Sequence, residues 1–223
     1  MDTPLISIVT ITYNAAACLE PTMQSVASQT CRDFEHIIID GASSDSTLEI
    51  ARRYPDTRIL SERDNGLYDA MNKGIGMARG KYLLFLNAGD AFHSNDVLAA
   101  YADRRMTAPR HLSAPAALTV DSFKQGMLVC HQAFMVRKEI APLYDLSYRF
   151  SADYDWTIRC MLNGDPRRFT NLSMIAIDYL SDGMTDRNKW KSLRERFRIM
   201  SKYYGFVPTA LRHVGFFIRN FRR

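Results

Sequence analysis

The chain has 223 residues, 47% of them hydrophobic and 24% charged, as in an ordinary folded domain. These proportions exclude a disordered chain and a fibrous one. No apolar run in the sequence approaches the roughly 20 residues that a membrane-spanning helix needs. The first ten residues carry an acid and no basic leader, so we expect no signal peptide. The four cysteines form no Cys-x-x-Cys pair, which favours reduced thiols in a cytoplasmic protein.

Charge is divided unevenly along the chain. The net charge is +5, from 29 Lys and Arg against 24 Asp and Glu. Residues 187–223 hold 11 of these basic residues and one acid, Glu195, which leaves 18 basic residues and 23 acids for residues 1–186. We therefore predict two units with different partners, a domain over 1–186 and a basic helical extension over 187–223.

The first part of the chain alternates between strand-like and helix-like segments. Apolar, β-branched runs predict buried strands, and apolar residues at helical spacing predict helices. The predicted strands are 5–13, 36–40, 58–61 and 82–86, and the predicted helices are 19–27, 46–54, 65–79 and 95–103. This order predicts an α/β fold, with a mainly parallel sheet covered by helices on both faces.

The later segments are less regular. We expect strands over 129–136 and 174–180 and a helix from Ser151 to Leu162, which Asn163-Gly164 ends. In the basic extension, one apolar stripe recurs at helical spacing: Trp190, Leu193, Phe197, Met200 and Tyr204. A second stripe follows Pro208: Leu211, Val214, Ile218 and Phe221. The extension therefore predicts two basic amphipathic helices.

Two carboxylates end strands of the predicted sheet. Asp40 ends the second strand, and Asp90 follows the fourth strand in the turn Asn87-Ala88-Gly89-Asp90. Ligands of parallel α/β sheets bind beyond the carboxyl ends of the strands. Carboxylates there can hold a divalent cation and, through it, a diphosphate. The plainer alternative is that each Asp only forms a turn or caps a helix.

Four motifs occur in a fixed order at the predicted strand ends. They are Tyr13-Asn14, the run Asp40-Gly41-Ala42-Ser43-Ser44-Asp45-Ser46-Thr47, the run from Asp64 to Gly74 and Asn87-Ala88-Gly89-Asp90. In this order the chain resembles a family 2 glycosyltransferase of the GT-A fold over about residues 5–185, and most of all the small bacterial enzymes that build colanic acid and similar exopolysaccharides. The resemblance implies transfer of a sugar, with inversion, from a nucleotide diphosphate to an acceptor hydroxyl.

The resemblance also implies the donor and metal residues. A Mn²⁺ or Mg²⁺ ion would bridge the diphosphate to Asp90, the one carboxylate left of the family's Asp-x-Asp-Asp motif. The donor, with a UDP-sugar as first choice, would contact seven residues: Tyr13, Asp40, Arg63, Asp64, Asn65, Asn72 and Lys73. Packing of Tyr13 on the sheet and solvation of Lys73 are the plainer alternatives.

The acceptor side is assigned from Ser151-Ala152-Asp153-Tyr154-Asp155, which resembles the family's Glu-Asp motif at a helix start. Inverting transfer needs a base for the acceptor hydroxyl, and the resemblance gives that role to Asp153. Asp155 lies about 200° further round the helix, so both acids cannot face one hydroxyl. The resemblance implies that His131 and Gln132, with Asp155, lie on the acceptor or sugar side, although a lone histidine in an apolar strand is more often a buried core residue. It also implies that Asp182 and Gly183 lie in a loop that can close over the diphosphate. The segment 91–130 is shorter than in the relatives of this resemblance, which puts the completeness of the acceptor site in question.

Other classes of function remain open at this stage. A nucleotidyltransferase would carry a Gly-rich basic loop after the first strand, where this chain has Tyr13-Asn14-Ala15-Ala16-Ala17. A non-catalytic GT-A domain that binds a nucleotide sugar, a membrane or a partner is the stronger alternative. We expect no nucleic-acid partner, because no such motif accompanies the basic extension. The extension instead suits an anionic membrane, its second helix above all, whereas packing of the first helix on the domain is an equal alternative. Membrane binding would place a cytoplasmic enzyme on the inner face of the plasma membrane, near a glycan acceptor such as one linked to polyprenyl diphosphate.

Overall fold

The structure is a computed structural model that describes residues 3–103, 118–165, 174–179 and 188–221. Its strands are β1 (Ile6–Thr12), β2 (Phe34–Asp40), β3 (Thr57–Ser61), β4 (Tyr82–Phe85), β5 (Ala91–Phe92), β6 (Val136–Arg137) and β7 (Ile177–Asp178). Its α-helices are α1 (Leu19–Ala27), α2 (Thr47–Arg52), α3 (Leu67–Met77), α4 (Val97–Asp103), α5 (Ala152–Asn163), α7 (Lys189–Tyr204) and α8 (Phe206–Phe221). Short 3₁₀ helices cover Val120–Gln125, His131–Ala133 and Lys138–Ile140.

The main sheet has the strand order β3-β2-β1-β4-β6. β1 pairs in parallel with both β2 and β4, β2 pairs in parallel with β3, and β6 joins the edge of β4 antiparallel. A second, small sheet pairs β5 with β7. The predicted α/β fold with a mainly parallel sheet is therefore confirmed. This topology places the ends of β1, β2 and β3 and the start of α3 along one edge.

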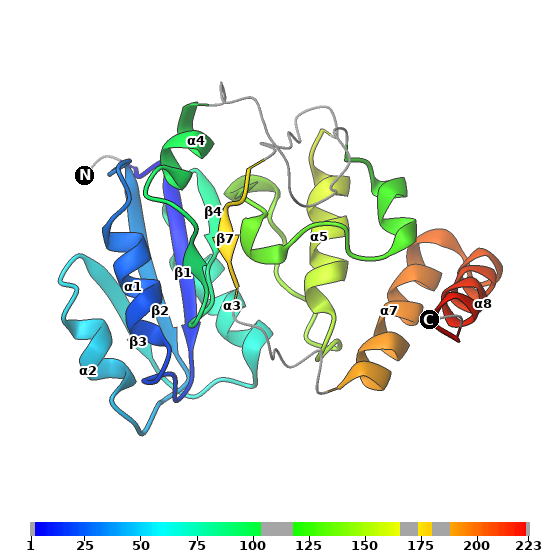
Figure 1. Ribbon diagram of the computed structural model, residues 1–223, viewed down its shortest axis with the longest axis horizontal. Coiled ribbons are helices and arrows are strands. Elements are labelled where there is room, and N and C mark those ends of the chain that lie inside the picture. Colours follow the sequence, from blue (N-terminus) through cyan, green and yellow to red (C-terminus); the bar gives the residue numbers. More distant parts are fainter. Residues whose placement is uncertain (1–2, 104–117, 166–173, 180–187, 222–223) are drawn as a thin grey trace.

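Buried apolar side chains cover both faces of the sheet, because most residues of β1, β2 and β4 are apolar. Buried polar residues of these strands are hydrogen-bonded, as Thr10 is to His36. On one face, Val9 and Phe85 pack with Met71 of α3 and Trp156 of α5. On the other face, two smaller clusters hold the sheet against α1, α2 and α4. Figure 1 shows α5, then α7 and then α8 lying outward to one side of the sheet.

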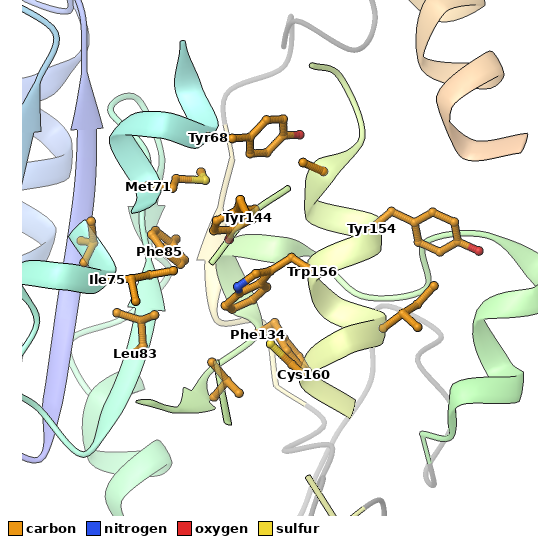
Figure 2. Close-up of a cluster of buried hydrophobic side chains, with 14 of the residues drawn as sticks. Tyr68, Met71, Ile75, Leu83, Phe85, Phe134, Tyr144, Tyr154, Trp156 and Cys160 are labelled. Carbon is orange, nitrogen blue, oxygen red and sulfur yellow. The ribbon is translucent and has the colours of Figure 1, made fainter. Parts of the chain in front are cut away.

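Aromatic rings fill the space between the sheet and α5 (Figure 2). Trp156 stacks on Tyr144 with ring centroids 4.9 Å apart and meets the edge of Phe85 at 5.8 Å. Its indole Nε1 donates to the carbonyl oxygen of Pro142 at 2.7 Å, so the buried polar atom is satisfied. This cluster fixes α5, which carries Asp153, relative to β4.

Two of the predicted strands are much shorter in the structure. The segment predicted as a strand over 129–136 holds the 3₁₀ helix His131–Ala133, and only Val136–Arg137 pairs with β4. Of the strand predicted over 174–180, only Ile177–Asp178 forms a ladder among the described residues. The apolar composition of these segments reflects packing into the cores, because His131, Phe134 and Ile177 are all buried.

The basic extension is not a separate body, because α7 packs on the domain. Ile199 and Met200 are buried in the same core as α5. Only the C-terminal part of the predicted stripe is buried: Met200 and Tyr204 pack in the core, whereas Trp190 is 77% exposed and Leu193 is 42% exposed. Gly205 then takes a φ of +87°, which favours glycine, and the chain turns into α8 at Phe206, two residues before the predicted start.

Candidate active site

The loop after β2 is held by the carboxylate of Asp40, which is fully buried. Its oxygens accept hydrogen bonds from the hydroxyl groups of Thr12 (2.9 Å) and Ser61 (2.7 Å) and from the hydroxyl and backbone N–H groups of Ser43. Burial alone would raise the pKa of Asp40, but these hydrogen bonds outweigh it and hold the pKa of the carboxyl below its usual value. Asp40 therefore ties together the ends of β1, β2 and β3. This differs from the expected direct donor contact.

The same loop brings Tyr13 and Asp64 together across Gly41. A Cβ on Gly41 would lie 2.7 Å from Oδ2 of Asp64 and 3.3 Å from Cδ2 of Tyr13, so glycine permits this approach. Ala42 has a φ of +61°, an uncommon backbone conformation for a residue with a side chain. Tyr13 is 69% exposed at this place. An aromatic ring and a carboxylate therefore flank one loop at the carboxyl edge, where the donor was expected.

The remaining predicted donor residues divide into two groups. Arg63 and Asn65 are exposed at the mouth of α3. Lys73 folds back on this mouth, where its Nζ donates to the carbonyl oxygen of Arg63 at 2.7 Å and pairs with Glu62 at 2.9 Å. Lys73 therefore shapes the turn that presents Arg63.

Asn72 points away from this turn, toward the chain that precedes α5. Its side-chain amide donates to the carbonyl oxygen of Tyr144 at 3.1 Å, and its Oδ1 accepts from the Tyr144 backbone N–H at 2.6 Å. Both ends of the amide are used, so Asn72 clamps the chain at Tyr144. This corrects the expectation that Asn72 contacts the donor.

The turn after β4 carries two oxygen ligands of the kind that a divalent cation takes. Asp90 is only 5% exposed, and the buried Oδ1 of Asn87 has no hydrogen-bond partner among the described residues. A carboxylate and an amide oxygen are the hard ligands that Mg²⁺ and Mn²⁺ take. Within the described ranges, no three His, Cys, Asp or Glu side chains gather as a metal site. The two oxygens fit a cation that takes its other ligands from a diphosphate and water.

Asp153 lies in the first turn of α5, half-buried. Its Oδ1 accepts a hydrogen bond of 3.2 Å from the hydroxyl of Tyr68, which is in the first turn of α3. Burial, with the Asp153 carboxylate in addition, raises the pKa of Tyr68 well above its usual value, so Tyr68 stays protonated and remains a donor. Tyr68 therefore fixes the orientation of the Asp153 carboxylate at the start of α5.

Asp155 faces the opposite way from Asp153, as the helical spacing predicted. Its carboxylate is fully buried and pairs with Arg159 Nε at 2.6 Å and Lys202 Nζ at 3.1 Å. It also accepts from the hydroxyl of Tyr203 at 2.8 Å. Asp155 therefore attaches α7 to α5. This corrects the expectation that it lies on the acceptor side.

His131 is buried between Phe85 and Trp156, and its Nε2 is hydrogen-bonded to the hydroxyl of Tyr144. Burial lowers the pKa of His131 despite the opposing effect of Asp153, so the ring is neutral. Gln132 accepts a hydrogen bond from the Cys130 thiol at 3.1 Å. Both side chains therefore support the site from within, and His131 does not face an open cleft. Asp182 and Gly183, expected in a closing loop, lie outside the described residues.

Asp90 and Asp153 both act electrostatically on the thiol of Cys130. Burial raises the pKa of the Cys130 thiol, and both Asp90 and Asp153 raise it further. The turn that carries Asp90 lies beside the end of β1, because the backbone N–H of Ala88 donates to the carbonyl oxygen of Ile11 at 3.4 Å. The site thus has a loop with Tyr13 and Asp64, a turn with Asn87 and Asp90, and a carboxylate at the start of α5.

Sequence comparison connects this site to known proteins. The sequence model of glycosyl transferase family 2 matches residues 7–106. A PGL/p-HBAD biosynthesis glycosyltransferase of Mycobacterium bovis is 37% identical over 186 residues, which cover 73% of this chain and 72% of that protein. The putative teichuronic acid biosynthesis glycosyltransferase TuaG of Bacillus subtilis is 26% identical and covers 93% of this chain and 95% of its own length.

Solved structures share the fold. TarS 1–349 of S. aureus aligns with a TM-score of 0.68 at 16% identity, over 88% of this chain and 65% of that one. A mannosyltransferase of Pyrobaculum calidifontis, in complex with GDP-Man and Mn²⁺, aligns with a TM-score of 0.66 at 16% identity, over 91% of this chain and 64% of that one. The fold is therefore that of GT-A glycosyltransferases. With the relatives above, this chain belongs to glycosyl transferase family 2 and is a glycosyltransferase, related to enzymes of cell-surface polysaccharide biosynthesis.

Sequence reasoning did not assign three residues that shape the site. Tyr68 lies within the quoted run from Asp64 to Gly74, but only its contact with Asp153 shows what it does. Asn87 occupies the first place of the turn that ends in Asp90, and its buried, unsatisfied oxygen marks it as a second ligand candidate. Glu195 binds the backbone N–H groups just before α5. Its place as the one acid of the basic extension was the available sign of such a role.

Proposed function

We propose that this enzyme transfers a sugar from a nucleoside diphosphate sugar to a hydroxyl of a cell-surface glycan precursor, with inversion at the anomeric carbon. The observation that carries the proposal is the half-buried carboxylate of Asp153 at the start of α5, which is hydrogen-bonded to Tyr68 in the first turn of α3, next to the exposed Arg63 and Asn65. In this proposal Asp153 is the base, and Asp90 would hold the diphosphate through a cation.

The chain's own residues supply the following steps. Asp153 accepts the proton of the acceptor hydroxyl as that oxygen forms a bond to the anomeric carbon. The bond from the anomeric carbon to the diphosphate oxygen breaks, and the nucleoside diphosphate leaves with the electron pair. Tyr68 holds Asp153 toward the acceptor. A divalent cation, when bound at Asp90 and Asn87, would neutralise the charge that develops on the leaving diphosphate.

On the donor side, Tyr13 and Asp64 border the loop that Asp40 organises. An exposed ring such as Tyr13 suits stacking on a nucleobase, and Asp64 suits a ribose or sugar hydroxyl. UDP-GlcNAc is bound by TarS, and GDP-Man by the Pyrobaculum enzyme, so both bases occur among proteins of this fold. We propose a UDP-sugar as the donor, and the experiment compares it with GDP- and dTDP-sugars.

The experiment is a donor panel followed by turnover. Thermal unfolding is measured with UDP-, GDP- and dTDP-sugars, with and without Mn²⁺, because a ligand of the folded state raises the melting temperature. The preferred labelled donor is then incubated with lipid-linked glycan acceptors, and the anomeric configuration of the product is read by NMR. Donor binding without transfer to any glycan acceptor would favour the alternative of a domain that only binds nucleotide sugars. A product of retained configuration would refute the inverting mechanism.

A further inference from the structure

The two C-terminal helices carry charge of one sign toward solvent. Lys191, Arg194 and Arg198 follow one another at helical spacing along α7, and all three are exposed, although Lys191 and Arg198 also lie over the rings of Phe150 and Tyr148. The one acid of the pair, Glu195, turns inward instead. Its carboxylate accepts hydrogen bonds from the backbone N–H groups of Arg149, Phe150 and Ser151 at 2.9, 2.8 and 2.9 Å. The sequences of α7 and α8 contain no acidic residue besides Glu195.

Exposed apolar side chains accompany these cations. On α8, Val207, Leu211 and Val214 recur at helical spacing and are 66, 71 and 57% exposed. The helix packs on α7 through other residues, since Thr209 is buried and His213 meets the ring of Phe197. On α7, Trp190 is exposed as well. Within the described residues, nothing covers this apolar row.

Hydrogen bonds and an ion pair fix the α7–α8 pair against the domain. Lys202 and Tyr203 bind Asp155 of α5, and Ser192 is hydrogen-bonded to Ser151 at 2.9 Å. Arg198 lies over the ring of Tyr148, in the segment that leads into α5. Figure 1 shows α7 between α5 and α8, with α8 at the outer edge. Whatever binds the outer surface is thus held at a set position relative to the helix that carries Asp153.

We infer that the α7–α8 pair is a docking surface for an anionic lipid bilayer. Anionic headgroups complement Lys191, Arg194 and Arg198, and the acyl boundary takes the apolar row of α8. No helix among the described residues is long and apolar enough to cross a bilayer, so the surface lies on the membrane. Charge complementarity selects an anionic membrane over a neutral one, and the uncovered aliphatic row suits lipid better than an acidic protein, whose polar surface would leave it unburied.

The test measures binding of the full-length protein to vesicles of phosphatidylcholine alone or mixed with phosphatidylglycerol. We expect recovery with the anionic vesicles only, and a loss of binding as salt rises. The triple variant K191Q/R194Q/R198Q should bind about 100-fold more weakly, since each basic residue near the surface contributes roughly fivefold. The variant V207S/L211S/V214S should also bind more weakly, at least about tenfold, because it removes apolar area from the contact.

The matched control is R52Q/R79Q/K81Q, which removes three exposed cations from other parts of the molecule. It should bind as the wild type does, and circular dichroism should show that all variants are folded. Equal recovery of the wild type from neutral and anionic vesicles overturns the inference. Equal weakening by the control and by the α7 variant also overturns it, since general positive charge would then suffice. If the wild type binds the anionic vesicles no better than vesicles of phosphatidylcholine alone, and a polyglutamate column retains it, the lipid inference is overturned. An acidic protein partner is then indicated instead.

Discussion

The hydroxyl of Tyr68 donates a hydrogen bond of 3.2 Å to Oδ1 of Asp153, across 85 positions of sequence. This contact joins the first turn of α3, beside the donor loop, to the first turn of α5. Because Tyr68 stays protonated, it orients the carboxylate without competing for the acceptor's proton. Two helix starts are thereby held together at the candidate base.

Tyr68→Phe should lower kcat about tenfold while leaving the affinity for the donor unchanged. A hydrogen bond to a charged group contributes roughly 1.5–3 kcal/mol, and about 1.4 kcal/mol is tenfold in rate. Steady-state kinetics with varied donor and acceptor separate kcat from KM. Tyr54→Phe is the control, since it loses a hydrogen bond to Glu20 on another part of the molecule. A wild-type kcat for Tyr68→Phe would show that the contact does not orient a base.

Asp153→Asn should lower kcat by about 10²-fold or more, because a positioned base contributes at least that much. Binding of the nucleoside diphosphate, measured by calorimetry, should stay near the wild-type value because the base acts on the acceptor. Retention of wild-type turnover would move the base to another residue.

Asp90→Asn should abolish the metal dependence of nucleoside diphosphate binding, and Asn87→Ala should weaken it. Isothermal titration with and without Mn²⁺ measures this dependence directly. Circular dichroism checks that the turn after β4 still folds. Unchanged stimulation by Mn²⁺ in Asp90→Asn would place the cation elsewhere.

Asp155→Asn should destabilise the protein by about 2 kcal/mol and leave the donor affinity intact, because Arg159 and Lys202 lose a buried counter-ion but can still reach solvent. Urea unfolding measures the change. Glu139→Gln breaks an exposed pair with Arg137 and should cost under about 1 kcal/mol. Equal costs for the two variants would mean that Asp155 does not anchor α7.

His36 predicts a loss of stability in mild acid. It is buried, hydrogen-bonded to the hydroxyl of Thr10 at 2.9 Å, and burial lowers its pKa from 6.5 to about 4. Above pH 6.5 neither the folded nor the unfolded chain holds the proton, so the free energy of unfolding is unaffected. Between pH 6.5 and 4 the unfolded chain binds the proton first, so stability falls as pH falls, by about 2 kcal/mol from pH 7 to 5.

Urea unfolding at several pH values checks this expectation. His36→Gln should reduce the loss between pH 7 and 5 by that amount. An identical pH profile for wild type and His36→Gln would exclude His36 as the cause.

Several features of this protein were already determined by the sequence. The apolar runs of β1, β2 and β4 and the helical spacing between them predict the parallel α/β sheet, because burial on both faces requires apolar residues throughout. The opposite directions of Asp153 and Asp155 follow from two steps along one helix. The ordered motifs identify the glycosyltransferase family. These are properties of neighbouring residues, or of their order along the chain.

Only the tertiary structure decided which polar side chains face the candidate site. Asp40, Asn72 and Asp155 were expected at the donor or the acceptor. Each instead forms hydrogen bonds to residues distant in the sequence: Asp40 to Ser61, Asn72 to Tyr144 and Asp155 to Tyr203 of α7. The segment 129–136 looks like a strand by composition, yet His131 packs between Phe85 and Trp156 and the chain turns there. Periodicity reports which residues prefer burial, but the partner that satisfies a buried polar group depends on where distant helices pack.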